Sequence, residues 1–72
     1  MDVNKLKSKM ALFGDNGGDL AKYLKISRTT LSGKMNETNG AEFTQNEILK
    51  IKEKYQLTGS EVDEIFFNSK VS

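Results

Sequence analysis

The chain of 72 residues contains neither cysteine nor histidine. A domain this short therefore has no disulfide or zinc site to support it, and one small apolar core must supply its stability. We expect a single domain spanning residues 1–72, without metal or cofactor. No signal-peptide pattern appears, and no apolar run approaches the roughly 20 residues that a bilayer span requires, so we expect a cytoplasmic protein.

Apolar residues recur three and four positions apart and proline is absent, which predicts an all-α fold. We expect five helices in a compact bundle. The first follows Asp2 as N-cap and ends at Gly14. The second covers 19–24, and the third covers 28–35 after Ser27 as N-cap. The fourth follows Thr44, whose spacing from Glu47 indicates a capping box, and the fifth starts near residue 61 with Ser60 as its cap.

The spacing also predicts which side chains face the core. The inward set consists of Val3, Leu6, Met10, Phe13, Leu20, Ala21, Leu24, Leu31, Met35, Ile48, Ile51, Tyr55, Val62, Ile65 and Phe66. Three further apolar residues lie outside this inward set: Leu12, Tyr23 and Phe67. Phe66 and Phe67 point about 100° apart on a helix, so the end of a small domain can hardly bury both.

Charge is distributed unevenly along the chain. Residues 1–36 carry seven Lys or Arg against three Asp or Glu, whereas residues 37–72 carry four against seven, which gives a total of +1. Binding to nucleic acid needs clustered cations to neutralise phosphates. The sequence therefore predicts that the first half of the chain faces an anion. The net charge is, however, low for a protein that binds DNA without a partner.

The segment LAKYLKISRTTLS, residues 20–32, resembles the helix-turn-helix of the lambda repressor/Cro family of phage and bacterial regulators. EFTQNEILKIKEKYQLTGSEVDEIFF, residues 42–67, is similar to the last two helices of short members from temperate phages of Gram-positive bacteria. The resemblance implies a lambda-repressor-like five-helix bundle with a helix-turn-helix at about 19–35. Two residues depart from the family pattern: Lys25 replaces the usual turn glycine, and Gly33 stands where Arg, Lys or Gln is common.

The resemblance also implies which residues would face DNA, because the second helix of such a motif enters the major groove. They are Ser27, Arg28, Thr29, Thr30, Ser32 and Lys34. Arg28 could pair with guanine and Lys34 could hold a phosphate. The alternative is that these residues form only a solvated helix face.

Within this family the chain is similar to modulator-of-repression antirepressors of lactococcal phages, including the terminal FFNSKVS. That similarity implies a bacterial host cytoplasm and a CI-type repressor as partner, with operator DNA bound only together with it. We expect the partner-binding residues to be Tyr23, Tyr55, Glu61, Glu64, Ile65, Phe66 and Phe67, and Asp63 to add to the acidic charge. The alternative for Phe67 is that it folds back on the first helix.

Three other functions compete with this one. A Cro-like homodimer would bind a palindromic operator through Arg28 and Thr29. An enzyme is disfavoured, because no nucleophile and base can be paired without His or Cys, and NGGD at 16–19 lacks the spacing of a phosphate loop, so we expect no small-molecule substrate. An antitoxin is disfavoured because no long disordered tail is available to wrap a toxin.

Overall fold

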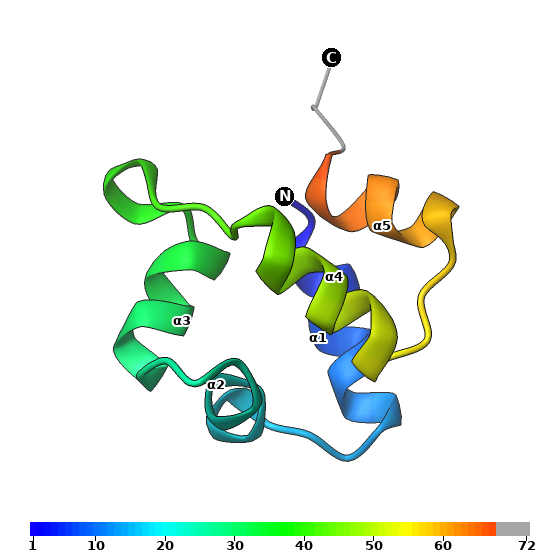
Figure 1. Ribbon diagram of the computed structural model, residues 1–72, viewed down its shortest axis with the longest axis horizontal. Coiled ribbons are helices and arrows are strands. Elements are labelled where there is room, and N and C mark those ends of the chain that lie inside the picture. The colour runs from blue at the N-terminus through cyan, green and yellow to red at the C-terminus, as the bar shows by residue number, and fades with distance from the viewer. Residues whose placement is uncertain (68–72) are drawn as a thin grey trace.

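The computed structural model describes residues 1–67 and shows five α-helices, one short 3-10 helix and, within those residues, no strand. The helices are α1 (Val3–Leu12), α2 (Gly17–Leu24), α3 (Arg28–Met35), η1 (Thr38–Gly40), α4 (Gln45–Lys54) and α5 (Gly59–Phe66). Figure 1 shows α2 and α3 at one end of the bundle and α5 at the other. The all-helical compact fold is thus confirmed. The NSKVS end of the family resemblance, 68–72, lies outside the described residues.

All five α-helices contribute side chains to one core. The buried residues are Leu6, Met10, Leu20, Ala21, Leu24, Leu31, Met35, Phe43, Ile51, Tyr55, Leu57, Val62 and Ile65. Val3, Ile48 and Phe66 pack against this core while partly exposed, as does Ile26 in the turn before α3. Because every helix supplies part of the core, none can be lost without exposing the others.

Phe13 departs from the predicted inward set. It is the C-cap residue of α1 and is 48% exposed, since the helix ends one residue before it. Its ring meets the edge of the buried Tyr55 ring, with centroids 5.3 Å apart. The prediction that Phe13 is buried was therefore wrong, although the side chain still covers part of Tyr55.

Side-chain caps fix where the helices begin. Asp2, Ser27 and Thr44 cap α1, α3 and α4 as predicted. Two predicted starts were wrong. Asn16 forms a reciprocal capping box with Asp19, so α2 starts at residue 17 instead of 19. Thr58, not Ser60, forms the equivalent box at the start of α5.

The first and last helices bring distant parts of the chain together. The Asp2 N–H donates to the carbonyl oxygen of Ile65 at 2.8 Å. Lys5 binds Glu64 with 2.7 Å between Nζ and Oε1, and Lys9 pairs with Glu61 one turn further along. These contacts join α1 to α5 along their length, and Figure 1 shows the N-terminus beside α5.

The turn between α2 and α3 depends on a left-handed residue. Lys25 has φ 62° and ψ 41°, and the N–H of Ile26 then donates to the carbonyl oxygen of Ala21 at 3.0 Å. Residues other than glycine are disfavoured in this region because Cβ crowds the backbone. The predicted strain at Lys25 is confirmed.

Glycine at position 25 is expected to stabilise the fold. Lys25→Gly should raise the free energy of unfolding by about 0.5–1 kcal/mol, because glycine adopts the left-handed conformation without that crowding. Lys22→Gly is the control, since it places glycine inside α2 and should lower the same quantity by about 1 kcal/mol. Urea unfolding measures both, and a loss of stability in Lys25→Gly would contradict the prediction.

Candidate DNA-binding and protein-binding surfaces

The N-terminus of α3 uses two of the predicted DNA-facing residues for its own cap. The Ser27 hydroxyl oxygen accepts the N–H of Thr30 at 3.0 Å, and the same hydroxyl donates to the Thr30 hydroxyl at 2.9 Å. Arg28 and Thr29 are exposed beside them. Of the first four predicted residues, Arg28 and Thr29 therefore present side chains without a hydrogen-bonding role in the cap.

Lys34 is held by the fold. Its ammonium lies 2.7 Å from Oε1 of Glu47, and its side chain is only 16% exposed. Burial raises the pKa of Glu47, but hydrogen bonds from Lys34 and Thr44 outweigh burial, and the pKa lies below its usual value. The Glu47 carboxyl is therefore ionised at neutral pH. Since Lys34 would have to abandon this carboxylate to reach a phosphate, the predicted phosphate contact does not fit the structure.

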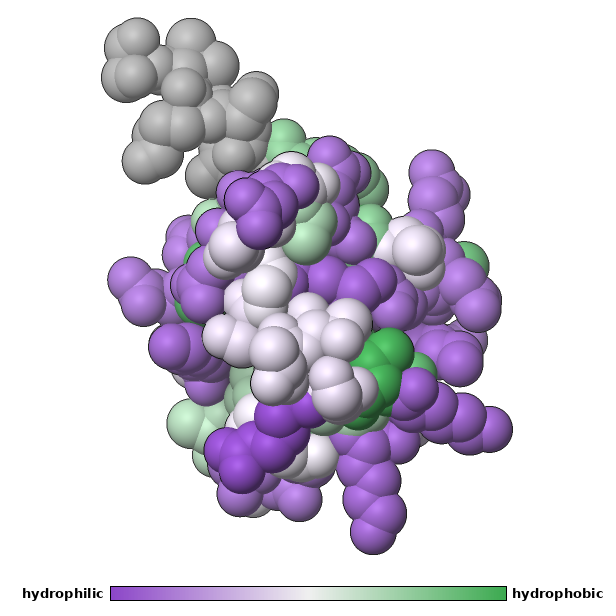
Figure 2. All heavy atoms as spheres, turned by 90° about the vertical axis from the view of Figure 1, so that its left-hand side faces the viewer, coloured by the Kyte–Doolittle hydropathy of each residue, from purple (hydrophilic) through white to green (hydrophobic). Residues whose placement is uncertain are grey.

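The remaining outer face of α3 is small and uncharged. Ser32 accepts a hydrogen bond from the Asn36 amide at 3.3 Å, and Gly33 has no side chain. Figure 2 shows this side of the molecule, with a band of residues of intermediate hydropathy across its centre. Arg28 is the one cation of α3 without an ion pair among residues 1–67. Such a face offers little charge to a phosphate backbone.

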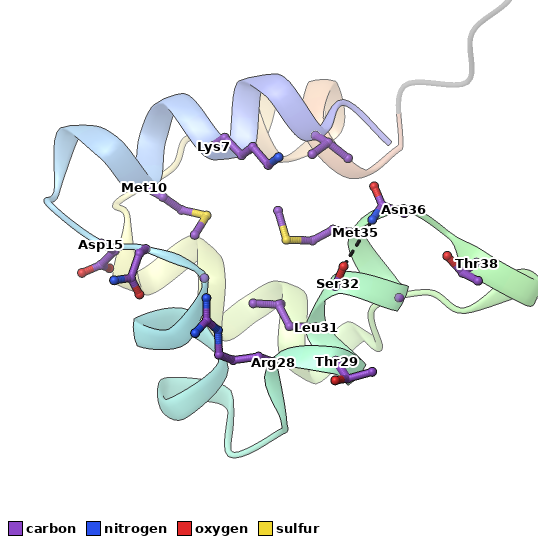
Figure 3. A pocket seen from close by; sticks show the side chains of 14 residues that line it. Lys7, Met10, Asp15, Arg28, Thr29, Leu31, Ser32, Met35, Asn36 and Thr38 are labelled. Atoms are coloured by element: carbon purple, nitrogen blue, oxygen red, sulfur yellow. Dashed lines mark hydrogen bonds between the residues drawn. The ribbon is translucent and has the colours of Figure 1, made fainter.

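A groove of about 780 Å³ lies between α1 and α3, and we call it the α1–α3 groove. Figure 3 shows Met10 and Met35 extending into it from the two helices. Its lining consists of Val3, Lys7, Met10, Asp15, Asn16, Gly17, Arg28, Thr29, Leu31, Ser32, Gly33, Met35, Asn36 and Thr38. Sequence reasoning missed this groove because its walls are far apart in the chain; the two inward methionines were the available signal.

A second, smaller hollow of about 290 Å³ lies between α4 and α5, and we call it the α4–α5 surface. It is lined by Gln45, Ile48, Leu49, Lys52, Gly59, Val62, Asp63 and Phe67. Leu49 is 56% exposed and Phe67 is 58% exposed. Of the two alternatives for Phe67, the structure shows the exposed one, whereas Leu49 was missed although it directly follows the inward residue Ile48.

Two of the predicted partner-binding residues are inside the core. Tyr55 is 2% exposed and Ile65 is fully buried, so neither can contact a partner in this fold. The Tyr55 hydroxyl donates to Asp15 at 2.9 Å, and burial together with that hydrogen bond raises the pKa of the phenol. Both assignments were wrong because these side chains lie on the helix faces that form the core.

Tyr23 is 40% exposed, but it lies on α2, at the far end of the bundle from α5 (Figure 1). The ammonium of Lys54 sits 4.7 Å from the centre of its ring, within the range of a cation–π contact. Tyr23 therefore does not share a surface with Phe67.

Two of the three predicted acidic residues of α5 are already paired. Glu61 binds Lys9, which lowers the pKa of that carboxyl, and Glu64 binds Lys5. Phe66 is half-buried, with its ring edge-to-face on Phe43 at 5.6 Å between centroids. Within the predicted α5 set, Phe67 is the apolar residue most available to a partner.

Residues 1–67 contain no group of three or more Asp or Glu side chains placed to hold a metal ion. No helix in that part of the chain is long and apolar enough to cross a membrane. Comparisons of the chain with models of known protein families, with curated proteins and with solved structures found no match.

Proposed function

We propose that the protein is an antirepressor of a temperate-phage switch between lysis and lysogeny, which binds a CI-type repressor and takes it off its operator. The resemblance of residues 20–32 and 42–67 to the lambda repressor/Cro family supports this proposal. We infer that α2, the turn at Lys25 and α3 form the helix-turn-helix of that family, because α2 packs against α3 and Ala21 of α2 is buried.

The observation that carries the proposal is that α3 has a single cation unpaired within residues 1–67, Arg28. Lys34 is bound to Glu47, and Gly33 offers no side chain to a base edge. Neutralisation of phosphates by Lys and Arg supplies most of the non-specific affinity for DNA. A helix with Arg28 as its only unpaired cation in the part of the chain that the structure describes therefore binds DNA weakly. Action on another DNA-binding protein fits this surface better than reading an operator alone.

The α4–α5 surface is the contact we assign to the repressor. Leu49 and Phe67 are each more than half exposed around one hollow, and aromatic side chains commonly dominate the energy of protein interfaces. Asp63 lies in the same lining and makes no ion pair within residues 1–67. Its carboxylate would face the basic DNA-binding side of a repressor and compete there with phosphate.

A mobility-shift titration on the intergenic DNA beside the gene tests the function. The protein alone, the neighbouring repressor alone and the two together are compared at moderate salt. We expect no shift with this protein alone, and release or supershift of the repressor complex when both are present. The antirepressor function is rejected if adding this protein changes neither the mobility of the repressor–DNA complex nor the fraction of DNA that the repressor occupies.

The second candidate is a Cro-like repressor, favoured by one observation: Lys22, Lys25 and Arg28 are exposed cations around the turn before α3. In that case the protein alone shifts the DNA, binding falls steeply as salt rises, and Arg28→Ala abolishes the shift. Those three results together would replace the antirepressor proposal with DNA reading by α3.

A further inference from the structure

Gly33 is not required by the fold. It lies inside α3, where glycine destabilises a helix relative to alanine, and its φ is not positive. A Cβ at this position would meet no atom within 4 Å beyond its own helix and chain neighbours. Neither backbone conformation nor internal crowding therefore explains the glycine, and the space over it is open.

Gly33 lines the α1–α3 groove. A glycine in the wall of a binding groove lets another backbone approach more closely than any side chain would permit. The neighbouring groove residues on α3, Thr29 and Ser32, are also small. This wall of the groove is thus shaped for close contact with a second main chain.

The groove has an apolar floor and a positive rim. The floor is formed by Met10, Leu31 and Met35, which are at most 7% exposed, and methionine side chains adapt readily when an apolar group packs over them. On the rim, Lys7 of α1 and Arg28 of α3 make no ion pair within the described chain. An occupant that complements both features carries apolar side chains flanked by carboxylates.

Asp15 does not cancel the rim charge. Its Oδ2 accepts the Tyr55 hydroxyl at 2.9 Å and lies 3.3 Å from the Lys54 ammonium. The carboxylate charge is thus already compensated by Lys54, and the charge presented to an occupant of the groove remains positive.

We propose that the α1–α3 groove receives an acidic amphipathic helix of a partner protein, whose backbone comes closest to α3 at Gly33. Helix-in-groove binding places apolar anchors three and four residues apart against such a floor, and carboxylates on its flanks meet Lys7 and Arg28. DNA fits less well, because the apolar floor gives phosphates nothing to bind. The groove and the α4–α5 surface share no lining residue, so this site is independent of the proposed repressor contact.

The test is an NMR titration of the ¹⁵N-labelled protein with a synthetic amphipathic helix of about 15 residues, long enough to form several turns. One peptide carries leucine on one face and glutamate on the other; a second replaces glutamate with lysine; a short DNA duplex is the third probe. We expect the acidic peptide to shift the amides of Lys7, Met10 and Gly33, and the lysine peptide to leave them in place.

Gly33→Gln should place a side chain in the open space over position 33 and weaken binding of the acidic peptide by about tenfold or more. A titration readily resolves such a difference in affinity. Gly59→Gln is the matched control, because Gly59 also has open space at Cβ but lines the α4–α5 surface. Thermal unfolding checks that both variants fold. Lys7→Glu with Arg28→Glu should also weaken binding, whereas Lys22→Glu, on the exposed side of α2, should not.

Four results would overturn the proposal. The acidic peptide could leave the groove amides unmoved, or bind equally well to the Gly33→Gln and Gly59→Gln proteins. The DNA duplex could shift the groove amides while the peptide does not, which would assign the groove to nucleic acid. The same amides could shift when the protein alone is concentrated, which would assign the groove to a second copy of the chain.

Discussion

Ile51→Ala is expected to lower the free energy of unfolding by about 2–5 kcal/mol, since it removes most of a fully buried side chain and leaves a cavity. Ile51 lies on α4 within the core that all five α-helices share. Small domains have only about 5–15 kcal/mol of stability in total, so this single change should consume a large part of it. Urea unfolding followed by circular dichroism measures the loss.

Leu49→Ala is the control for that change. Leu49 lies on the same helix but is 56% exposed, so its truncation should alter the free energy of unfolding by less than about 0.5 kcal/mol. Similar losses in the two variants would mean that α4 does not face the core as described, and would contradict the assignment of the α4–α5 surface.

The second large effect concerns repressor binding and depends on the proposed function. Phe67→Ala should weaken binding of the repressor about 30-fold or more, because an exposed aromatic anchor at an interface commonly contributes about 2 kcal/mol or more. Leu49→Ala should weaken it in the same direction. The free energy of unfolding should stay close to that of the wild-type protein, since both side chains are more than half exposed.

Tyr23→Ala provides the matched control, because it removes another exposed aromatic ring at the opposite end of the bundle. Isothermal titration calorimetry with the repressor should give an unchanged dissociation constant for Tyr23→Ala. Asp63→Lys is the charge variant of choice, since Glu64→Lys would also break the internal pair with Lys5. If Tyr23→Ala weakened binding and Phe67→Ala did not, the contact would lie at the α2 end.

Local sequence signals predicted the helices well where one cap was available. Thr44 and Glu47 are three residues apart, and their reciprocal bonds fixed the start of α4. At the start of α5, Ser60 was the predicted cap, but Thr58 caps the helix because Glu61 completes a reciprocal box with it. Which residue caps the helix depends on the hydrogen bonds that form in the folded chain, and the spacing of apolar residues does not show them.

The candidate surfaces were less predictable, because they depend on contacts between distant residues. Lys34 lies on the accessible side of a helix by its spacing, but Glu47, 13 residues further along, binds it. Helical periodicity predicts which residues leave the core stripe, and it identified Tyr23 and Phe67. It cannot place them on different faces of the bundle or bring α1 beside α3, since both depend on how the helices pack.

The joining of α1 to α5 has a consequence for folding during synthesis. The ribosome delivers α1 before α5, because Glu64, which binds Lys5, follows it by 59 residues, and Ile65, which binds Asp2, comes next. Translation proceeds at about 5–20 residues per second, whereas small helical domains fold in microseconds to milliseconds. The nascent chain therefore lacks its closing helix until α5 has left the ribosome. The domain should then fold in one rapid step, which also completes the surface around Phe67.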